Sequence, residues 1–228
     1  TQGVSSAASD VYKRQALKPT VNCDNGVWRA RISFFDHDVP CEPKWGNWFE
    51  SHIAFQKHYA QIAQRTGCEL FLTGCEMTMT EHRETEWRKL IAEVRTVYDG
   101  PVGYNCDKYG EDHITWWEAV DVIASSGYYP IDDWENQLDR IEEVVKKYQK
   151  PFLFSEAGCM NIHGSAQVPN NWELRGEEDD AEQADWYLAM FSACEKRDWV
   201  KGFGIWDWPG SMERKSPYAV CDRPAEAA

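Results

Sequence analysis

The chain has 228 residues, of which 43% are apolar and 14% aromatic, enough for one sizeable folded domain rather than a disordered chain. It has no apolar run of about 18 residues, which excludes a transmembrane helix. Its formal net charge of −14 disfavours nucleic acid and anionic membranes as partners. Twelve tryptophans in so acidic a chain favour a neutral, ring-shaped ligand such as a sugar, because indole faces stack on apolar ring surfaces.

The cysteines and the two ends of the chain bear on where the protein works. No two of the eight cysteines have C-x-x-C spacing, which favours reduced thiols and a cytoplasmic location. Residues 1–15 have the composition of a non-native, adapter-like segment, so the domain is expected to span residues 16–228. Both ends read as cut, which leaves open a secreted enzyme whose signal peptide has been lost.

In the N-terminal half, apolar runs of strand length alternate with amphipathic segments. Pro19 weakens the first strand, and residues 28–47 have the irregular, aromatic pattern of a long loop. Thr78 and Glu81 fit a capping box at the start of a helix that runs to Tyr98. The predicted strands of this half are 17–22, 69–73 and 102–105, and the predicted helices are 48–65 and 78–98.

The C-terminal half continues this alternation. Asp132 and Glu135 open a helix that Pro151 ends, and a loop at 158–178 carries Trp172. The predicted strands of this half are 120–125, 152–155 and 202–206, and the predicted helices are 116–119, 132–150 and 180–196.

Alternation of strands and helices with short connections predicts a parallel sheet and a (β/α)8 TIM barrel. A complete barrel needs about 250 residues. The pattern here fits an incomplete barrel that holds strands three to eight and lacks the first two βα units and the last helix. The strands at 17–22 and 202–206 would then be open edges, so we expect this chain alone to be poorly soluble and inactive.

Two glutamates stand at strand ends, where the active residues of such barrels lie. Glu76 and Glu156 are three strand–helix units apart, which predicts that they face each other across the mouth of the barrel. Two carboxyl groups about 5 Å apart hydrolyse glycosides with retention of configuration. We expect Glu76 to be the acid/base and Glu156 the nucleophile. Each carboxylate by itself also fits a helix-start position satisfied by backbone N–H groups.

Polar and aromatic residues near the other strand ends are the candidate sugar contacts. Tyr128 ends the strand before that of Glu156, where its hydroxyl can hydrogen-bond a carboxylate. Trp206 and Trp208 end the last strand, where an indole ring can form the floor of a sugar subsite. Each candidate also has a structural explanation as a core or loop residue. The remaining candidates are Asn105 with Asp107 and Lys108, Lys18, Trp28, Arg29 and Trp172.

Several of these segments together resemble glycoside hydrolase family 113, a group of retaining, β-mannanase-like (β/α)8 enzymes. They include LKPTVN followed by Trp28-Arg29, GCEMTMTEHRETEWRKLIAEVRTVYDGPVGYN, SSGYYPI, KPFLFSEAG, EEDDAEQADWYLAMF and GFGIWDWP, and the resemblance covers residues 16–228.

The resemblance implies the same roles for the two glutamates, and that Tyr128 orients the nucleophile. It also implies a Trp of Trp206-Asp207-Trp208 under the sugar. The implied protein is a single-domain hydrolase of β-linked glycans, with β-1,4-mannan as substrate and no metal or organic cofactor. We expect the complete enzyme to be a monomer.

One departure from the family pattern is Cys75, where the clan usually has Asn directly before the acid/base. A thiol is a poor hydrogen-bond partner, so recognition of the sugar 2-hydroxyl, and of mannose over glucose, must differ or come from elsewhere. Two other functions stay open. One is a non-catalytic carbohydrate-binding barrel. The other is a metal hydrolase in which Cys23, Cys75, Cys106 and Cys159 hold zinc.

Overall fold

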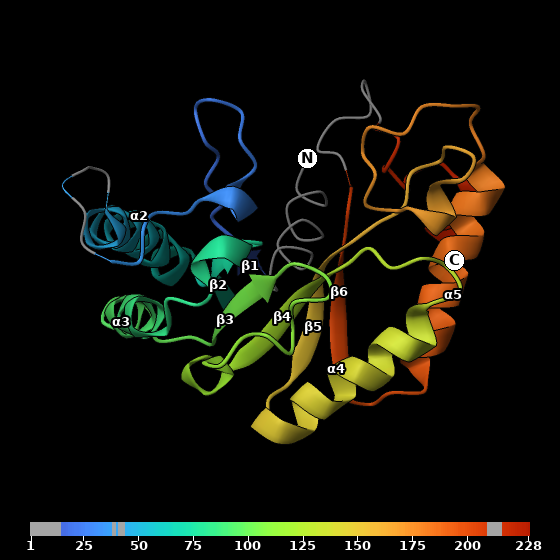
Figure 1. Cartoon of the computed structure of the whole chain (residues 1–228). Helices are drawn as coiled ribbons and strands as arrows, with labels where there is room; N and C mark the ends of the chain where they lie inside the picture. Colours follow the sequence, from blue (N-terminus) through green and yellow to red (C-terminus); the bar gives the residue numbers. More distant parts are fainter. Residues whose placement is uncertain (1–14, 38–39, 41–43, 209–215) are drawn as a thin grey trace, which may run out of the picture. The chain divides into compact units, whose positions relative to one another are not determined.

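The computed structural model of the chain describes residues 15–37, 40, 44–208 and 216–228. Within them, six strands follow one another in chain order, and the strand pairs whose register is defined are parallel (Figure 1). This confirms the predicted class, an incomplete (β/α)8 barrel with six of its eight strands. The strands are β1 (Ala16–Leu17), β2 (Leu70–Cys75), β3 (Val102–Cys106), β4 (Val122–Gly127), β5 (Phe152–Ala157) and β6 (Val200–Ile205).

Helices connect the strands, as expected for parallel neighbours. Four of the five connections contain an α-helix, and the connection from β3 to β4 contains only a 3₁₀ turn, η3 (Trp117–Ala119). The α-helices are α2 (Trp45–Thr66), α3 (Glu84–Val94), α4 (Trp134–Tyr148) and α5 (Asp180–Glu195). The other 3₁₀ turns are η1 (Arg29–Arg31), η2 (Thr78–Thr80), η4 (Ser165–Gln167) and η5 (Pro224–Ala227).

The first strand is much shorter than the sequence predicts. The expected strand at 17–22 is wrong beyond its first residue, because β1 contains only Ala16 and Leu17. Pro19 has no N–H to donate to the neighbouring strand, so the ladder cannot continue regularly through it. The chain therefore leaves the sheet early and enters a turn in which the Gly26 N–H donates to the Cys23 carbonyl.

The capping box predicted at Thr78 and Glu81 is also wrong. Thr78 begins the 3₁₀ turn η2, and α3 starts only at Glu84 and ends at Val94 rather than at Tyr98. The Glu81 carboxylate instead accepts a hydrogen bond of 2.7 Å from the Tyr104 hydroxyl. The hydrogen bond from Tyr104, 23 residues later in the chain, therefore takes the place of the predicted local cap.

The chain divides into two compact units, each with its own aromatic core. The first holds β1 to β3, α2, α3 and η3, and the second holds β4 to β6, α4, α5 and residues 107–113. In the first unit the Trp87 ring stacks on Trp116 with 5.2 Å between centroids. In the second, Trp134 packs edge-on against Trp186 at 5.4 Å.

The twelve tryptophans separate into core and surface residues. Six are buried, namely Trp45, Trp87, Trp116, Trp117, Trp134 and Trp186. Four are exposed, namely Trp28, Trp172, Trp206 and Trp208, and these are the four that the sequence selects as sugar contacts. The high tryptophan count thus reflects core packing as well as surface chemistry.

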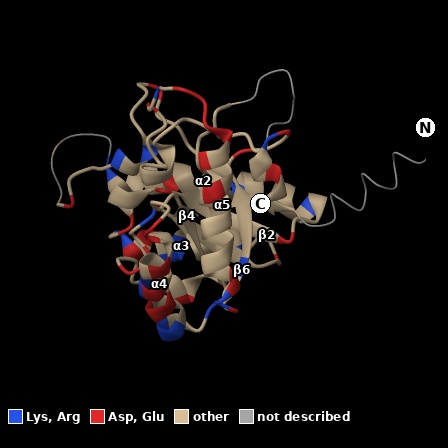
Figure 2. Cartoon of the chain, turned by 90° about the vertical axis from the view of Figure 1, so that its right-hand side faces the viewer, with Lys and Arg blue, Asp and Glu red and all other residues tan. Residues whose placement is uncertain are grey.

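Charged side chains follow the helix surfaces. In Figure 2 acidic residues run along α4 and basic residues gather at its C-terminal end, where Lys146 and Lys147 complement the helix dipole. No helix in the described ranges has both the length and the apolar character needed to span a bilayer. The seven described cysteines are free thiols, and Cys41 lies outside the described residues.

Candidate active site

Glu76 lies directly after β2 in the first unit, as the sequence predicts. Its backbone has φ 52°, and its N–H donates to the Asn105 carbonyl of the neighbouring β3 at 2.8 Å. This left-handed conformation is uncommon for a residue with a side chain and is typical of functional positions. Only 8% of the residue is exposed, so the carboxylate is held in a fixed, largely desolvated place at the carboxyl end of the strand.

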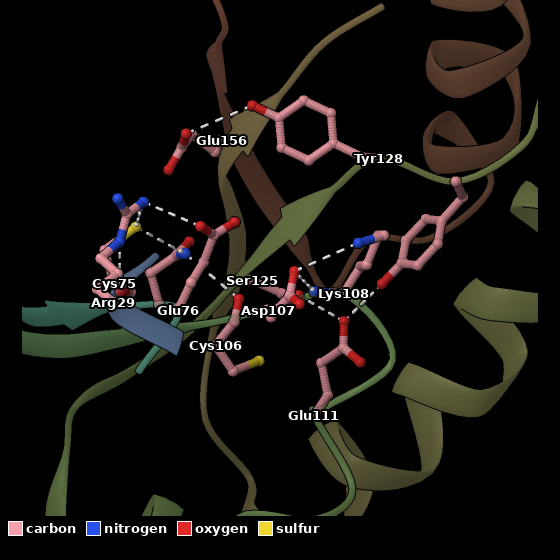
Figure 3. Close-up of polar contacts among 12 residues, drawn as sticks. Arg29, Cys75, Glu76, Cys106, Asp107, Lys108, Glu111, Ser125, Tyr128 and Glu156 are labelled. Carbon is pink, nitrogen blue, oxygen red and sulfur yellow. Dashed lines mark hydrogen bonds and ion pairs between the residues drawn. The ribbon is translucent and has the colours of Figure 1, made fainter. Parts of the chain in front are cut away.

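Arg29 of η1 is a charged partner of Glu76 (Figure 3). Its Nη2 donates to Glu76 Oε2 at 2.9 Å, and its Nε donates to the Cys75 carbonyl at 2.9 Å. The sequence predicts Arg29 as a sugar contact, whereas the structure places its guanidinium on the candidate acid/base. This ion pair fixes the position of the Glu76 side chain at the strand end.

Cys75, the residue that departs from the family pattern, is buried between polar groups. Its Sγ lies 3.4 Å from Arg29 Nη2 and 3.5 Å from Asn105 Nδ2. Asn105 is fully buried, and its amide also donates to the Cys106 carbonyl at 3.3 Å. The thiol thus accepts hydrogen bonds from two groups that the sequence predicts to contact sugar.

The other two candidates of the first unit lie nearby in sequence. Lys18 follows β1 directly and is half-buried. Trp28 precedes η1 and is 45% exposed, so its indole is accessible to a ligand. The structure joins Arg29, Cys75, Glu76 and Asn105 in one cluster.

A buried tyrosine fixes the segment after Glu76. The Tyr104 hydroxyl accepts a hydrogen bond from the Met77 N–H at 3.1 Å and donates to Glu81. Burial, reinforced by the nearby Glu81 carboxylate, raises the pKa of Tyr104 well above its ordinary value, so the phenol stays protonated and remains a donor. This contact anchors the backbone one residue after the candidate acid/base.

Glu156 lies in β5 of the second unit and is likewise only 8% exposed. The Tyr128 hydroxyl donates to Glu156 Oε1 across 3.4 Å, the contact that the sequence predicts (Figure 3). Tyr128 follows β4 directly, and its ring meets Tyr218 edge-on at 6.3 Å. Glu156 is therefore a buried carboxylate with a phenolic hydrogen bond at the carboxyl end of a parallel strand.

The three tryptophans of the second unit that the sequence predicts as sugar contacts present accessible indole rings. Trp206 follows β6. Its backbone N–H donates to the Ala157 carbonyl at 2.8 Å, and this bond ties Trp206 to the strand end that carries Glu156. A Cβ at Gly158 would come within 2.2 Å of the Trp206 carbonyl oxygen, so only glycine permits this approach. Trp208 and Trp172 are 61% and 68% exposed.

A buried acidic network in the second unit was not predicted from the sequence. Glu111 is fully buried and accepts hydrogen bonds from the Ser125 and Tyr129 hydroxyls, both at 2.5 Å. Arg140 Nη2 of α4 pairs with the same carboxylate at 2.6 Å. No local sequence pattern indicates that Glu111 is buried, because its charged partner Arg140 lies 29 residues away in the chain.

Loop residues 107 and 108, predicted as possible hydroxyl binders, pair with each other. Lys108 Nζ lies 3.6 Å from Asp107 Oδ1, and the Lys108 N–H donates to the same oxygen at 2.9 Å (Figure 3). Burial raises the pKa of Asp107, an effect that the charge of Lys108 partly offsets.

The metal hypothesis based on cysteines gains no support from the described residues. Within them, only His163, Asp179 and Glu182 bring three possible ligand atoms within 4.8 Å of one another, and this group contains no cysteine. Both carboxylates already accept backbone hydrogen bonds. Asp179 caps the Glu182 N–H at 2.9 Å, and Glu182 binds the N–H groups of Gly164 and Ala166. The group therefore holds the loop after β5 against α5.

Comparisons with known proteins agree with this arrangement. A model of Glycoside Hydrolase Family 113 matches residues 4–222. Two structures of a family 113 β-1,4-mannanase, one of them a complex, are 54% identical to this chain with TM-scores of 0.92 and 0.91. Each match covers 97% of this chain and 74% of the mannanase. A comparison with curated proteins finds no match.

Two further structures show how far sequence identity and structural similarity extend. The family 113 β-mannanase from Alicyclobacillus acidocaldarius, in complex with ManMIm, is 41% identical with a TM-score of 0.91, over 99% of this chain and 74% of that one. The β-glucuronidase from Ruminococcus gnavus in complex with D-glucuronic acid is 16% identical with a TM-score of 0.60, over 77% of this chain and 33% of that one, and shares the fold alone. The family model and the two mannanases match nearly the whole chain, which therefore belongs to glycoside hydrolase family 113.

Proposed function

We propose that the protein hydrolyses β-1,4-mannan and manno-oligosaccharides with retention of configuration, with Glu76 as acid/base and Glu156 as nucleophile. The observation that carries this proposal is the placement of two buried glutamates at the carboxyl ends of two parallel strands, each with a polar partner on its carboxylate. The 54% identity to a β-1,4-mannanase supports mannan as the substrate.

In the first step, a Glu156 carboxylate oxygen attacks the anomeric carbon and forms an ester bond to the sugar. The glycosidic C–O bond breaks, and protonated Glu76 donates its proton to the departing oxygen. Arg29 stabilises the Glu76 carboxylate that remains. Tyr128 holds Glu156 in position for the attack.

In the second step, Glu76 acts as a base. It takes a proton from a water molecule, whose oxygen attacks the anomeric carbon while the ester bond to Glu156 breaks. The sugar leaves with its original configuration, Glu156 is again a carboxylate, and Glu76 is again protonated. No other co-reactant than water is required.

The function is tested by assaying two preparations. One is the 228-residue chain. The other is a hybrid barrel in which residues 16–222 replace the matched part of the 54%-identical mannanase, so that all eight strands are present. We expect the hybrid barrel to release reducing sugar from β-1,4-mannan faster than from xylan or β-glucan, and NMR to show the β-anomer as first product. Initial release of the α-anomer, or preference for another glycan, would contradict the proposal.

Variants of the two glutamates separate catalysis from mere sugar binding. Glu76→Gln in the hybrid barrel is expected to lower kcat on mannan by about 10²–10⁴-fold, because the proton donor is lost. Glu156→Gln should abolish turnover while mannotriose binding persists, because only the nucleophile is removed. Unchanged kcat in either variant would favour the alternative of a barrel whose catalytic groups lie elsewhere.

A further inference from the structure

A cavity of about 420 Å³ lies in the first unit, beside the loop between β1 and α2. This volume falls within the range of small-molecule sites. The cavity is formed by residues 21–25 and 31–34 together with Trp48 of α2. The mechanism above makes no use of it.

One wall of the cavity is aromatic. Trp48 stacks one indole face on the His52 imidazole, with 4.7 Å between centroids and 22° between planes, and Phe34 lies 6.4 Å from the same indole. Burial lowers the pKa of His52 to about 4, so the imidazole behind Trp48 is neutral near pH 7. An indole supported in this way offers an apolar surface of the kind that stacks on a sugar ring.

The lining of the cavity also includes charged and polar side chains. Asp24 and Arg31 both line the cavity, and neither side chain has an ion pair or hydrogen bond to any residue that the structure describes. Asn25 accepts the Val27 N–H through Oδ1 at 3.1 Å, which leaves its amide NH₂ as a donor. One carboxylate acceptor, one guanidinium and one amide donor suit a neutral polyol, whereas Asp24 disfavours an acidic sugar.

The same 3₁₀ turn links this cavity to the candidate acid/base. Arg29 of η1 binds Glu76, and Arg31, at the other end of η1, lines the cavity. We propose that the cavity is a subsite for a neutral hexose unit of the same β-linked chain that Glu76 helps to cleave. This proposal rests on the proposed function and adds a further sugar position to it.

The test is calorimetric titration of the 228-residue chain with mannotriose, with cellotriose and D-glucuronic acid as comparison ligands. Arg31→Ala and Asp24→Ala are each expected to weaken mannotriose binding about tenfold, because each removes a charge-assisted hydrogen bond. Arg65→Ala, which removes an exposed arginine of α2 outside the cavity, should bind as the parent chain does. Circular dichroism checks that all variants stay folded.

The outcomes separate this inference from the proposed function. If the hybrid barrel hydrolyses mannan but Arg31→Ala and Asp24→Ala bind mannotriose as tightly as the parent chain, the cavity is not a subsite although the function stands. Absence of mannotriose binding to the parent chain overturns the inference in the same way. Tighter binding of D-glucuronic acid than of mannotriose would also overturn it. A hybrid barrel inert on mannan contradicts the proposed function itself.

Discussion

One hydroxyl, that of Tyr128, contacts the proposed nucleophile Glu156. The hydrogen bond spans 3.4 Å and joins the end of β4 to β5. We predict that Tyr128→Phe lowers kcat on mannan about tenfold in the hybrid barrel, because a less well oriented carboxylate attacks more slowly. KM should stay within about threefold, since the sugar contacts are retained. Tyr59→Phe, which removes a hydroxyl of α2, is the matched control. An equal loss in both variants would rule out a specific role for Tyr128.

His52 is a buried base, and its effect on the folding stability of the chain depends on pH. It is 4% exposed, and its Nε2 has no hydrogen-bond partner among the described residues. Desolvation lowers its pKa from 6.5 to about 4. Between these values the unfolded chain binds a proton that the folded chain does not, so folding stability falls as the pH falls from 6.5 to 4. The loss amounts to about 3 kcal/mol.

Replacing this histidine should therefore flatten the pH dependence of stability. His52→Phe keeps an aromatic ring beside Trp48 and Trp87 and removes the titrating group. Urea unfolding at pH 7 and pH 4.5 is expected to show a smaller difference between the two pH values for the variant than for the parent chain. His58→Phe, a change on the same helix, is the control. If the folding stability of His52→Phe depends on pH as that of the parent chain does, His52 is not the source of this dependence.

At the scale of elements, the Glu111 network ties residues 107–113 to β4 and α4. Tyr129, whose hydroxyl binds Glu111, directly follows Tyr128, and the Trp186 indole donates to the Tyr129 carbonyl at 2.8 Å. The network thus fixes the strand end that carries Tyr128. Glu111→Gln is expected to cost about 3 kcal/mol, because the partly buried Arg140 loses its charge partner.

An exposed partner of the same arginine provides the control. Arg140 also pairs with Asp112 at 2.9 Å, but that carboxylate is half exposed. Asp112→Asn should change the unfolding free energy by about 1 kcal/mol or less. In the hybrid barrel, Glu111→Gln should lower kcat more than it changes KM, whereas Asp112→Asn should leave both unchanged. Equal stability losses in the two variants would show that burial of Glu111 is unimportant.

The sequence predicts those parts of the fold and site that depend on local pattern. The position of Glu76 and Glu156 at strand ends is predictable because a strand of apolar residues ends beside each of them. The capping box failed because Tyr104, distant in sequence, binds Glu81. Glu111 and the role of Arg29 on Glu76 could not be predicted, since each depends on side chains from separate elements that meet only after folding.

At the scale of the whole chain, six parallel strands in sequence order give the described sheet two outer strands, β1 and β6. β1 has only two residues and offers little backbone for pairing. β6 has six residues, from Val200 to Ile205, and pairs with β5 on one side. An unpaired strand edge can pair with the edge strand of a second copy. Repulsion between chains of net charge −14 opposes this association, and dissolved ions screen that repulsion.

We therefore predict that the 228-residue chain self-associates with rising concentration and that a charge on β6 reduces this association. Gly202 is suited to the change, because a Cβ there has no heavy atom within 4 Å. Gly202→Lys should shift light-scattering mass toward the monomer, since lysine on an edge strand must be desolvated before a second strand can pair. Gly46→Lys adds the same charge at another open glycine, in α2, and should leave the association unchanged. If Gly202→Lys reduces association no more than Gly46→Lys does, the β6 edge does not govern it, and a monomeric parent chain would refute the prediction outright.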